Sequence, residues 1–198
     1  YKALPVVPKI FYKQNAQDNA KGADSVHIVI EDNNDFSIWF GEAKFYNSIE
    51  DARISEILTS IENSLLTEKL KKENSIITNV SDIDLLITDE NLRNAIKATL
   101  SPRESIDLIK PKLHIPILLL HECGITQKQT SVTSDYVEEL IVYHKNRSES
   151  FFKKQISKIG AIPYYSAIRF HLILFPVPLK KTIVDRFVSI ADFYKNLK

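Results

Sequence analysis

The stretch "SVHIVIEDNNDFSIWFGEAKFY", residues 25–46, decides the fold of this 198-residue chain. Apolar and polar positions alternate over residues 23–31 with the period of two that is typical of a strand. Residues 32–35, "DNND", have the composition of a turn, and residues 36–45 form a second strand-like run. Two such runs on either side of a short polar turn predict a β-hairpin.

The end of the second strand carries both signs of charge inside an apolar and aromatic run. Glu42 and Lys44 are two positions apart, so on a strand they project from the same face, whereas Ala43 faces the other way. A charge on a covered face is costly unless a partner or a metal compensates it. A surface ion pair between strand neighbours, worth about 0–1 kcal/mol, is the alternative interpretation.

The length of the hairpin loop determines where Asp24 lies relative to this pair. With a three-residue loop, facing residue numbers sum to 66 or 68, and Asp24 lies opposite Glu42 or Lys44. Cross-strand neighbours have Cβ atoms roughly 4.5–5.5 Å apart, close enough for two carboxylates to share one ion. A two-residue loop would give a sum of 67 and put Asp24 on the other face, unless a bulge at Gly41 restored the parity.

An aspartate followed by Glu-x-Lys at the end of the next strand is the pattern of the PD-(D/E)xK nuclease superfamily. Residues 21–48, "KGADSVHIVI…WFGEAKFYNS", more specifically resemble the HamA nuclease subunit of the Hachiman anti-phage defence systems and its AbpA-like relatives. The motifs that carry this resemblance are "G-x-D-x-x-H", from Gly22 to His27, and "GEAKFY", from Gly41 to Tyr46. The rest of the chain resembles the family only in the order of its elements.

The resemblance implies a role for each residue of the motif. Asp24 and Glu42 would bind a divalent metal, Mg²⁺ or Mn²⁺, with the Ala43 carbonyl as a further ligand. Lys44 would orient the attacking water or help to deprotonate it. Phosphodiester hydrolysis suits such a site, because a hard cation with oxygen ligands polarises the phosphate and generates hydroxide. A lysine beside the metal can stabilise charge that develops on the phosphoryl oxygens.

Two departures from the superfamily pattern concern the completeness of this site. The residue before Asp24 is Ala23, so the "PD" is absent. Many superfamily members also add an acidic residue from a helix that precedes the first strand. We expect that ligand, and the natural start of a chain that contains no methionine, to lie upstream of Tyr1. His27 falls three positions after Asp24 and hence on the opposite face, where a structural role or a hydrogen bond is expected.

The remaining periodicities complete the predicted fold. A helix capped by Asn47, with Glu50 in a capping-box position, is predicted to run to about Lys72. The other predicted elements are a strand-like segment at 10–12, short helices over 81–110, a strand over 114–122, a helix over 134–159, a strand over 164–175 ended by Pro176 and Pro178, and a helix over 180–197. This order implies an α/β fold with a mixed central β-sheet flanked by helices, a PD-(D/E)xK restriction-endonuclease-like core. We expect one nuclease domain over residues 1–198, with a helical insertion at about 76–112.

Positive charge is concentrated at the end of the chain. Residues 151–198 carry nine Lys or Arg and two Asp or Glu, although the whole chain has a net charge of +1. Clustered cations attract phosphates, and a solvated helix surface is the alternative interpretation. Lys180 and Lys181 start the last predicted helix, where the helix dipole disfavours them. The candidates for DNA-backbone contacts are Lys153, Lys154, Lys158, Lys180, Lys181 and Arg186.

Composition excludes several classes of protein. No apolar run approaches the ~20 residues of a membrane-spanning helix, and no secretory signal opens the sequence. The single cysteine, Cys123, excludes an internal disulfide and multi-cysteine zinc sites, so a reducing, cytoplasmic setting is expected. The chain has no G-x-x-x-x-G-K-[ST] loop, so motor activity would have to come from another chain. The cluster "HEC" at residues 121–123 is interpreted as structural.

The sequence therefore favours a metal-dependent DNA endonuclease with little sequence specificity. The resemblance further implies that it acts as the effector of a bacterial defence system, with a helicase partner. An alternative is a catalytically inactive nuclease-fold module that binds DNA or a helicase. A metal-free hydrolase built on Cys123 is a third possibility, and it would be sensitive to thiol alkylation rather than to chelators.

Overall fold

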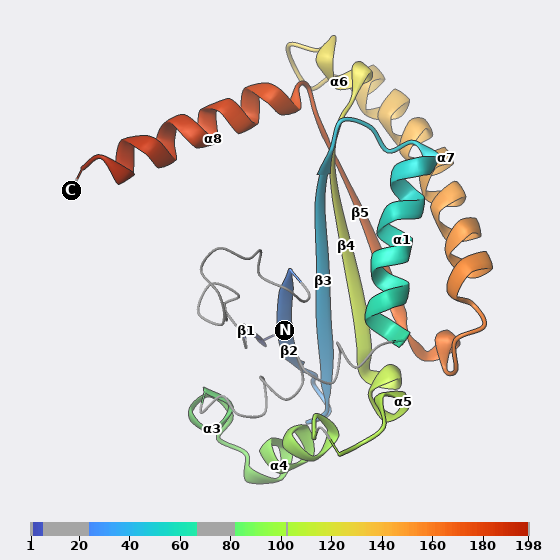
Figure 1. Ribbon diagram of the computed structural model, residues 1–198, viewed down its shortest axis with the longest axis vertical. Coiled ribbons are helices and arrows are strands. Elements are labelled where there is room, and N and C mark those ends of the chain that lie inside the picture. The colour runs from blue at the N-terminus through green and yellow to red at the C-terminus, as the bar shows by residue number, and fades with distance from the viewer. Residues whose placement is uncertain (1, 6–23, 67–81, 102, 198) are drawn as a thin grey trace. The chain divides into compact units, whose positions relative to one another are not determined.

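The computed structural model describes residues 2–5, 24–66, 82–101 and 103–197 of the chain (Figure 1). The strands are β1 (Lys2–Pro5), β2 (Ser25–Ile30), β3 (Phe36–Tyr46), β4 (Leu113–Glu122) and β5 (Arg169–Val177). The α-helices are α1 (Asp51–Leu66), α3 (Asp82–Leu86), α4 (Glu90–Thr99), α5 (Ile106–Ile109), α6 (Gly124–Gln127), α7 (Ser134–Ile159) and α8 (Lys180–Lys195). Two 3₁₀ turns, η2 (Lys110–Lys112) and η3 (Tyr165–Ala167), complete the described elements.

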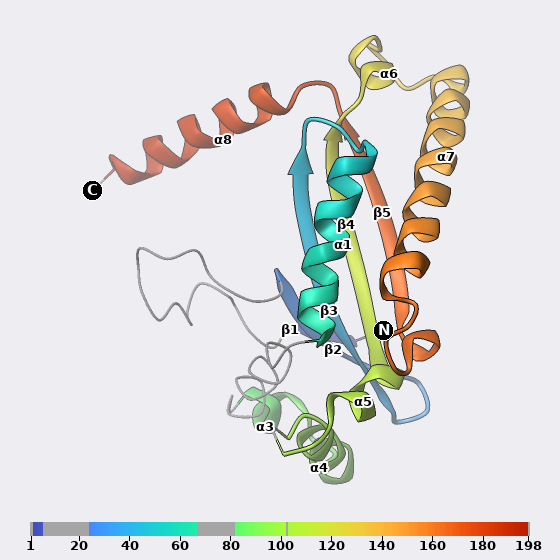
Figure 2. The same ribbon diagram turned by 45° about the vertical axis from the view of Figure 1, so that its right-hand side comes forward.

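The strands form one five-stranded sheet in the order β1-β2-β3-β4-β5. The pairs β1–β2 and β2–β3 are antiparallel. Strands β3, β4 and β5 run in the same direction, and helical segments connect β3 to β4 and β4 to β5 (Figures 1 and 2). The sheet is therefore mixed and accompanied by helices, which confirms the prediction of an α/β fold.

The chain forms two compact units, each of which has its own buried residues. The first unit comprises Tyr1–Glu42, Ile57–Ile117 and Gln155–His171, and the second comprises Ala43–Glu56, Leu118–Lys154 and Leu172–Lys198. Fully buried side chains of the first unit include Ile28, Ile38, Ile57, Ile96, Leu113 and Ile159. Those of the second unit include Ile49, His121 and Phe151. Whether residues 1–198 are one domain stays a prediction.

The predicted cap of the first long helix is wrong. Helix α1 begins at Asp51, and the N–H of Ile54 donates to the Glu50 carbonyl, so Glu50 rather than Asn47 holds the capping position. The Glu50 carboxylate does not turn back to cap the helix, because it accepts a 2.9 Å hydrogen bond from Arg147 of α7. The predicted end near Lys72 lies outside the described residues.

The boundaries of the last strand also differ from the prediction. Residues 165–167 form the 3₁₀ turn η3 instead of a strand, after Tyr164 with a left-handed φ of 61°. Strand β5 then continues through Pro176 to Val177, whose carbonyl accepts from the Cys123 N–H. Proline is tolerated there because β5 is an edge strand, where a missing N–H costs no ladder hydrogen bond.

Other predicted elements are found close to their expected positions. The helix over 134–159 and the strand over 114–122 correspond to α7 and β4, and helices α3 to α5 occupy the described part of the predicted insertion. The strand-like segment 10–12 and insertion residues 76–81 lie outside the described residues. Among the helices that the structure describes, none combines the length and apolar character needed to cross a bilayer.

Candidate active site

The β2–β3 hairpin sets the position of Asp24 relative to the E-A-K motif. Its pairs run from Ile30 with Phe36 to Ser25 with Gly41, so facing residue numbers sum to 66. The Glu31 N–H donates to the Asp35 carbonyl, which leaves a three-residue loop over 32–34. This confirms the loop with an odd number of residues that the site hypothesis required. No bulge interrupts the pairing of the two strands between Ser25 and Ile30.

Asp24 lies one residue before β2 and remains paired with β3 through its backbone. Its N–H donates to the Gly41 carbonyl at 2.8 Å, one residue beyond the last pair of the ladder, Ser25 with Gly41. Gly41 permits this close approach, since a Cβ there would lie 2.1 Å from the Ser25 hydroxyl oxygen. Asp24 is exposed and Glu42 is half-buried. Asp24 therefore directly precedes Ser25, and Glu42 directly follows Gly41, at the terminal pair of the ladder.

Glu42 is also connected to helix α1. The hydroxyl of Ser60 donates a 3.2 Å hydrogen bond to Oε1 of Glu42. By strand alternation, Glu42 lies on the same face of β3 as Phe40, and Trp39 and Gly41 lie on the other. A hydroxyl that donates to a carboxylate fixes its orientation, and such outer partners are common around metal-binding carboxylates.

Ala43 and Lys44 continue the same strand at the start of the second compact unit. The Lys44 ammonium donates to the Ala43 carbonyl at 3.4 Å. Ala43 is exposed, and Lys44 is half-buried. The predicted carbonyl ligand and the predicted catalytic amine are thus adjacent to one another.

Lys180, the first residue of α8, holds the end of this strand. Its ammonium donates to the carbonyl of Phe45 at 2.6 Å and lies 5.2 Å from the centroid of the Phe45 ring. Phe45 directly follows Lys44, so Lys180 restrains the backbone next to the predicted catalytic amine. A cation whose hydrogen bond is made to backbone in this way acts as a positioning residue.

The oxygen ligand types of the candidate site fit a hard cation. Asp24 and Glu42 offer carboxylate oxygens and Ala43 offers a carbonyl oxygen, the ligand types that Mg²⁺ and Mn²⁺ prefer. Within the residues that the structure describes, no group of three or more His, Cys, Asp or Glu side chains could hold a metal ion. Two carboxylates suit Mg²⁺, which usually binds one or two carboxylates and completes its octahedron with water and substrate phosphate oxygens.

Most of the predicted DNA-binding cations have partners within the protein. Lys158 lies 3.3 Å from Glu62 in the first unit. In the second unit, Lys154 lies 3.4 Å from Asp51, and Lys181 pairs with Asp185 on its own helix. Lys153 and Arg186 are exposed and have no ion pair among the described residues. DNA binding by the six cations stays a prediction.

The two lysines at the start of α8 have a structural explanation that requires no phosphate. The Glu122 carboxylate accepts from the Lys180 backbone N–H at 2.7 Å and so places a negative charge at the helix N-terminus. That charge offsets the unfavourable effect of the dipole on Lys180 and Lys181. The sequence analysis missed this role of Glu122, because the two residues are 58 positions apart.

Comparison with known protein families identifies the chain. The family described as HamA matches residues 1–191. The chain belongs to the HamA family. No curated protein and no solved structure gives a match. The match confirms the resemblance carried by the two motifs, and HamA membership supports a role in Hachiman defence.

This HamA chain contains an aromatic cluster that its sequence did not reveal. The rings of His114 and His171 both stack on Trp39, with centroids 4.4 and 4.8 Å away. The two imidazoles are joined by a 2.9 Å contact between Nδ1 of His114 and Nε2 of His171. Arg169 donates to Nε2 of His114 at 3.4 Å, so the His114 proton is on Nδ1 and is donated to His171. Burial, with smaller contributions from His171 and Arg169, lowers the pKa of His114.

The "HEC" cluster lies in a second histidine pair of this HamA chain. His121 is fully buried, its Nδ1 contacts the Glu122 carbonyl, and its Nε2 lies 3.0 Å from Nε2 of His144. Because a carbonyl only accepts, His121 carries its proton on Nδ1, and His144 donates through Nε2. Burial, followed by the neighbouring His121, lowers the pKa of His144 to about 4. Cys123 is buried as well. These contacts favour the structural interpretation of residues 121–123.

His27 occupies the face that the sequence analysis expected. It pairs with Trp39 across the hairpin and therefore shares the face of Ser25 and Gly41. This placement separates His27 from the face of Glu42. A role for His27 within the sheet remains the better interpretation.

Proposed function

We propose that this chain is a metal-dependent DNA endonuclease with little sequence specificity, the effector of a Hachiman-type anti-phage defence system. Its substrate is the DNA phosphodiester bond, and its cofactor is Mg²⁺ or Mn²⁺. Its partner is the helicase subunit of the same system (HamB-like), which restrains the nuclease until infection. Membership of the HamA family supports the defence role.

The observation that carries the proposal is the hairpin register. Among the possible loop lengths, only an odd loop pairs Asp24 with Glu42 without a bulge, and the register sums to 66. Asp24 and Glu42 lie at the same end of the β2–β3 ladder, which supports the proposal that they bind one metal ion together. Ser60 supports the Glu42 carboxylate from α1, and Lys180 supports the backbone beside Lys44.

Each residue of the proposed site has a separate task in hydrolysis. When bound, the metal ion polarises the scissile phosphate and lowers the pKa of a coordinated water. Asp24 and Glu42 bind the ion, and the Ala43 carbonyl supplies a further oxygen. Lys44 orients the attacking water and donates to the phosphoryl oxygens, whose charge increases as the new P–O bond forms and the bond to the leaving sugar oxygen breaks. The attacking water gives up its proton to bulk water, and the leaving oxygen takes a proton from water.

A plasmid-nicking assay on the natural full-length chain tests the proposal. The wild type should nick supercoiled DNA with Mg²⁺ or Mn²⁺, and chelation should stop the reaction. Glu42→Gln, Asp24→Asn and Lys44→Met should each abolish nicking while leaving the thermal midpoint near that of the wild type. Asp32→Asn removes an exposed acidic side chain of the hairpin loop and provides the matched control, which should retain full activity. Nicking that survives Glu42→Gln would refute the assignment.

The second candidate function is an inactive module that binds DNA or a helicase. Internal pairing of Lys154, Lys158 and Lys181 removes part of the expected phosphate-binding surface, and this argues against a role based on DNA binding alone. Binding of DNA without cleavage under any divalent metal would favour this module. Sensitivity to thiol alkylation with no effect of chelators would instead favour chemistry at Cys123, although burial of that cysteine makes such chemistry unfavourable.

A co-purification experiment tests the helicase partner separately. The tagged full-length chain, co-expressed with the helicase of its own system, should elute as a complex. Nicking by the complex should be slower than nicking by the free chain. Separate elution at low salt would refute this part of the proposal without affecting the nuclease assignment.

A further inference from the structure

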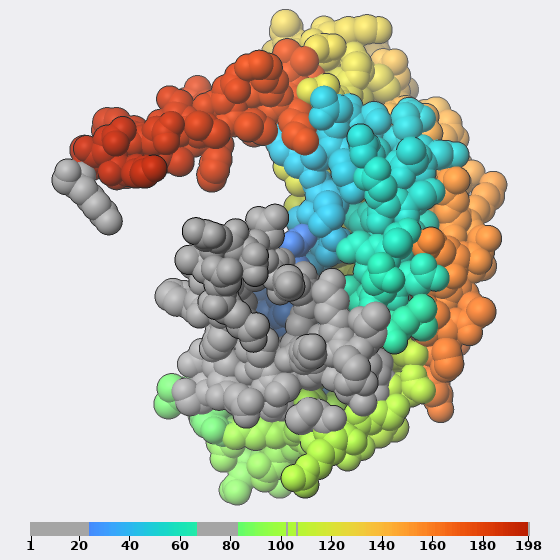
Figure 3. Space-filling view, in the orientation of Figure 1, coloured from blue at the N-terminus to red at the C-terminus, as the bar shows by residue number. Residues whose placement is uncertain are grey.

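Helix α8 has an apolar surface that no described element covers. None of its residues is buried, and its side chains lie open on the face displayed in Figure 3, where α8 is red. The exposed fractions of its large apolar side chains range from 39% to 71%: Ile183, Val184, Phe187, Val188, Ile190, Phe193 and Tyr194. Exposed apolar area of this kind marks an interaction surface.

The length of α8 also indicates that another surface stabilises it. It has 16 residues, only slightly more than the ~12–15 below which isolated helices are marginal in water even with favourable sequences. Most helical stability in proteins comes from packing an apolar face against another element. The HamA match extends to residue 191, so it includes most of α8. The helix is therefore part of the family fold rather than an appended tail, and its covering surface should be a regular part of the assembly.

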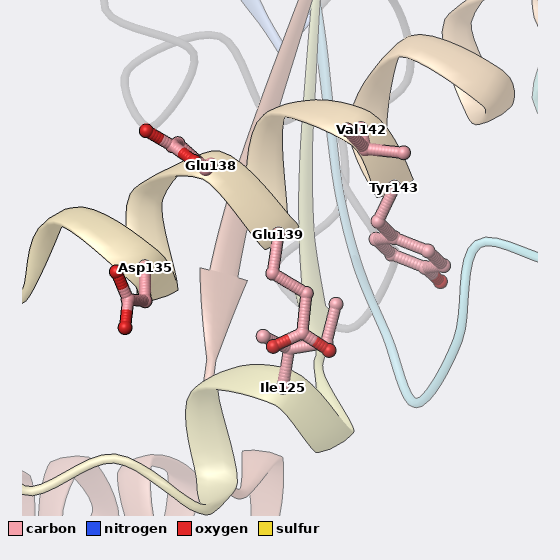
Figure 4. Close-up of a pocket in the computed structure, with 6 residues that line it drawn as sticks. All are labelled: Ile125, Asp135, Glu138, Glu139, Val142 and Tyr143. Carbon is pink, nitrogen blue, oxygen red and sulfur yellow. The ribbon is translucent and has the colours of Figure 1, made fainter.

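A groove of complementary character lies between α6 and α7 of the same compact unit. It has a volume of about 540 Å³ and is lined by Ile125, Asp135, Glu138, Glu139, Val142 and Tyr143. Figure 4 shows Glu139 reaching from α7 toward Ile125 on α6. Val142 is 60% exposed, as is Ile141 beside it on α7. The groove thus combines apolar surface with three carboxylates.

The charges of the groove and of α8 are opposite. Among the described residues, no ion pair involves Asp135, Glu138 or Glu139. Residues 180–195 carry four basic and two acidic side chains, and Arg186 and Lys195 have no ion pair among the described residues. An amphipathic helix with basic margins fits a groove that has an apolar floor and acidic margins.

We propose that this chain forms a two-fold symmetric dimer in which α8 of each copy lies in the α6–α7 groove of the other. The exposed apolar face of α8 packs on Ile125, Ile141 and Val142, and Arg186 and Lys195 lie near the three carboxylates. A two-fold axis makes each contact twice, so both helices and both grooves are covered at once. The dimer goes beyond the proposed nuclease activity and does not depend on it, because none of the proposed catalytic residues takes part.

Light scattering coupled to size-exclusion chromatography tests the dimer with the full-length chain alone. The wild type should have twice the monomer mass at high micromolar concentration and should dissociate on dilution. The double variant Phe187→Glu/Phe193→Glu should be monomeric, with the near-UV circular dichroism of the wild type, because both side chains are exposed within one copy. A wild type that is monomeric at every concentration, or that dimerises only when another protein is present, would overturn the proposal.

Charge reversal identifies the groove as the binding surface. Glu138→Lys/Glu139→Lys should weaken dimerisation at least about 10-fold, and so should Arg186→Glu/Lys195→Glu. A mixture of the two variants should form a heterodimer, because one of its two contacts keeps the natural charges and the other has both reversed. Asp192→Asn on α8 provides a matched control and should dimerise like the wild type. Loss of the dimer in the helix variant but not in the groove variant would overturn the placement of α8 in this groove.

Cross-linking gives a second, independent measurement. Val142→Cys and Phe187→Cys place thiols on the groove and on the helix, and the natural Cys123 is buried. Mixing the two variants and adding a short bismaleimide should give a covalent species of twice the chain mass. The same pair of cysteines with Phe193→Glu added should not cross-link. Equal cross-linking with and without that substitution would show random collision and would overturn the proposal.

Discussion

The hydroxyl of Ser60 donates a hydrogen bond to a carboxylate oxygen of Glu42, with 3.2 Å between the two oxygens. This bond links helix α1 to the strand that carries the E-A-K motif. Ser60 lies 18 residues after Glu42, and no sequence motif marked it. A residue that orients a metal ligand affects metal binding before it affects stability.

Ser60→Ala should therefore raise the Mg²⁺ concentration needed for half-maximal nicking by about 10-fold, as loss of an outer partner typically does. The maximal rate at saturating Mg²⁺ should change less than the metal requirement, because Glu42 itself is retained. Metal titrations of the nicking rate measure both quantities. Ser64→Ala on the same helix removes a hydroxyl that donates to the Ser60 carbonyl, and it should leave the titration unchanged. A shared effect of both variants would indicate a general loss of helix stability instead.

Lys180→Met should lower the free energy of unfolding by about 1–3 kcal/mol, since it removes a charged hydrogen bond to the Phe45 carbonyl. The nicking rate should fall as well, because the backbone beside Lys44 loses its restraint. Thermal unfolding followed by circular dichroism measures the first effect. Lys181→Met is the control: its side chain is 83% exposed and its pair with Asp185 is worth little. Equal destabilisation by both variants would contradict a specific role for Lys180.

The hairpin was predictable because all of its determinants are local. Alternation predicted the two strands, and the odd loop that the parity argument required is the one that the observed register has. The E-A-K motif then required no information from distant residues. Local chemistry of this kind allowed both the α/β class and the core of the candidate site to be read from the sequence.

Features that depend on distant residues were not predictable. Helix α1 starts later than expected because Glu50 is held by Arg147, 97 residues away. The contact between His114 and His171 spans 57 positions, and no motif marks either residue. Periodicity predicted that α8 is amphipathic, but amphipathicity states only that an apolar face exists, not which surface covers it.

The pair formed by the buried His121 and the half-buried His144 should make the protein less stable in acid. The pKa of His144 is lowered from 6.5 to about 4, so between these values the unfolded chain binds more protons than the folded one. The free energy of unfolding should therefore be fully present above pH 6.5 and should decrease as the pH falls toward 4. His144→Gln keeps a donor for His121 but does not titrate, so the decrease should be smaller. Urea unfolding at a series of pH values measures the difference. Identical slopes for variant and wild type would exclude this pair as the cause.

Trp39 should report directly on the other histidine pair. It is the only tryptophan in the chain, and both His114 and His171 stack on its ring. A protonated imidazole quenches indole fluorescence, and the pKa of His114 is lowered by burial, so quenching should begin only below pH 6.5. Emission measured during acid titration of the native protein provides the test. His114→Asn should remove most of the transition, whereas His144→Gln, in the other histidine pair, should leave it in place.

Asn34 should be sensitive to side chains that resist the left-handed conformation. It has a φ of 58° and is the last residue of the three-residue loop that sets the register of β2 and β3. Asn34→Ala should destabilise the protein by about 1–2 kcal/mol, because a Cβ without local hydrogen bonding is unfavourable in this region. Asn34→Gly relieves that cost but loses the exposed 3.2 Å hydrogen bond to Asp89, so it should be nearly neutral. Chemical unfolding compares the two. Since the loop sets the pairing of the two strands beside which Asp24 and Glu42 lie, nicking should fall more in Asn34→Ala than in Asn34→Gly. Equal stability of the two variants would mean that the left-handed residue does not constrain the hairpin.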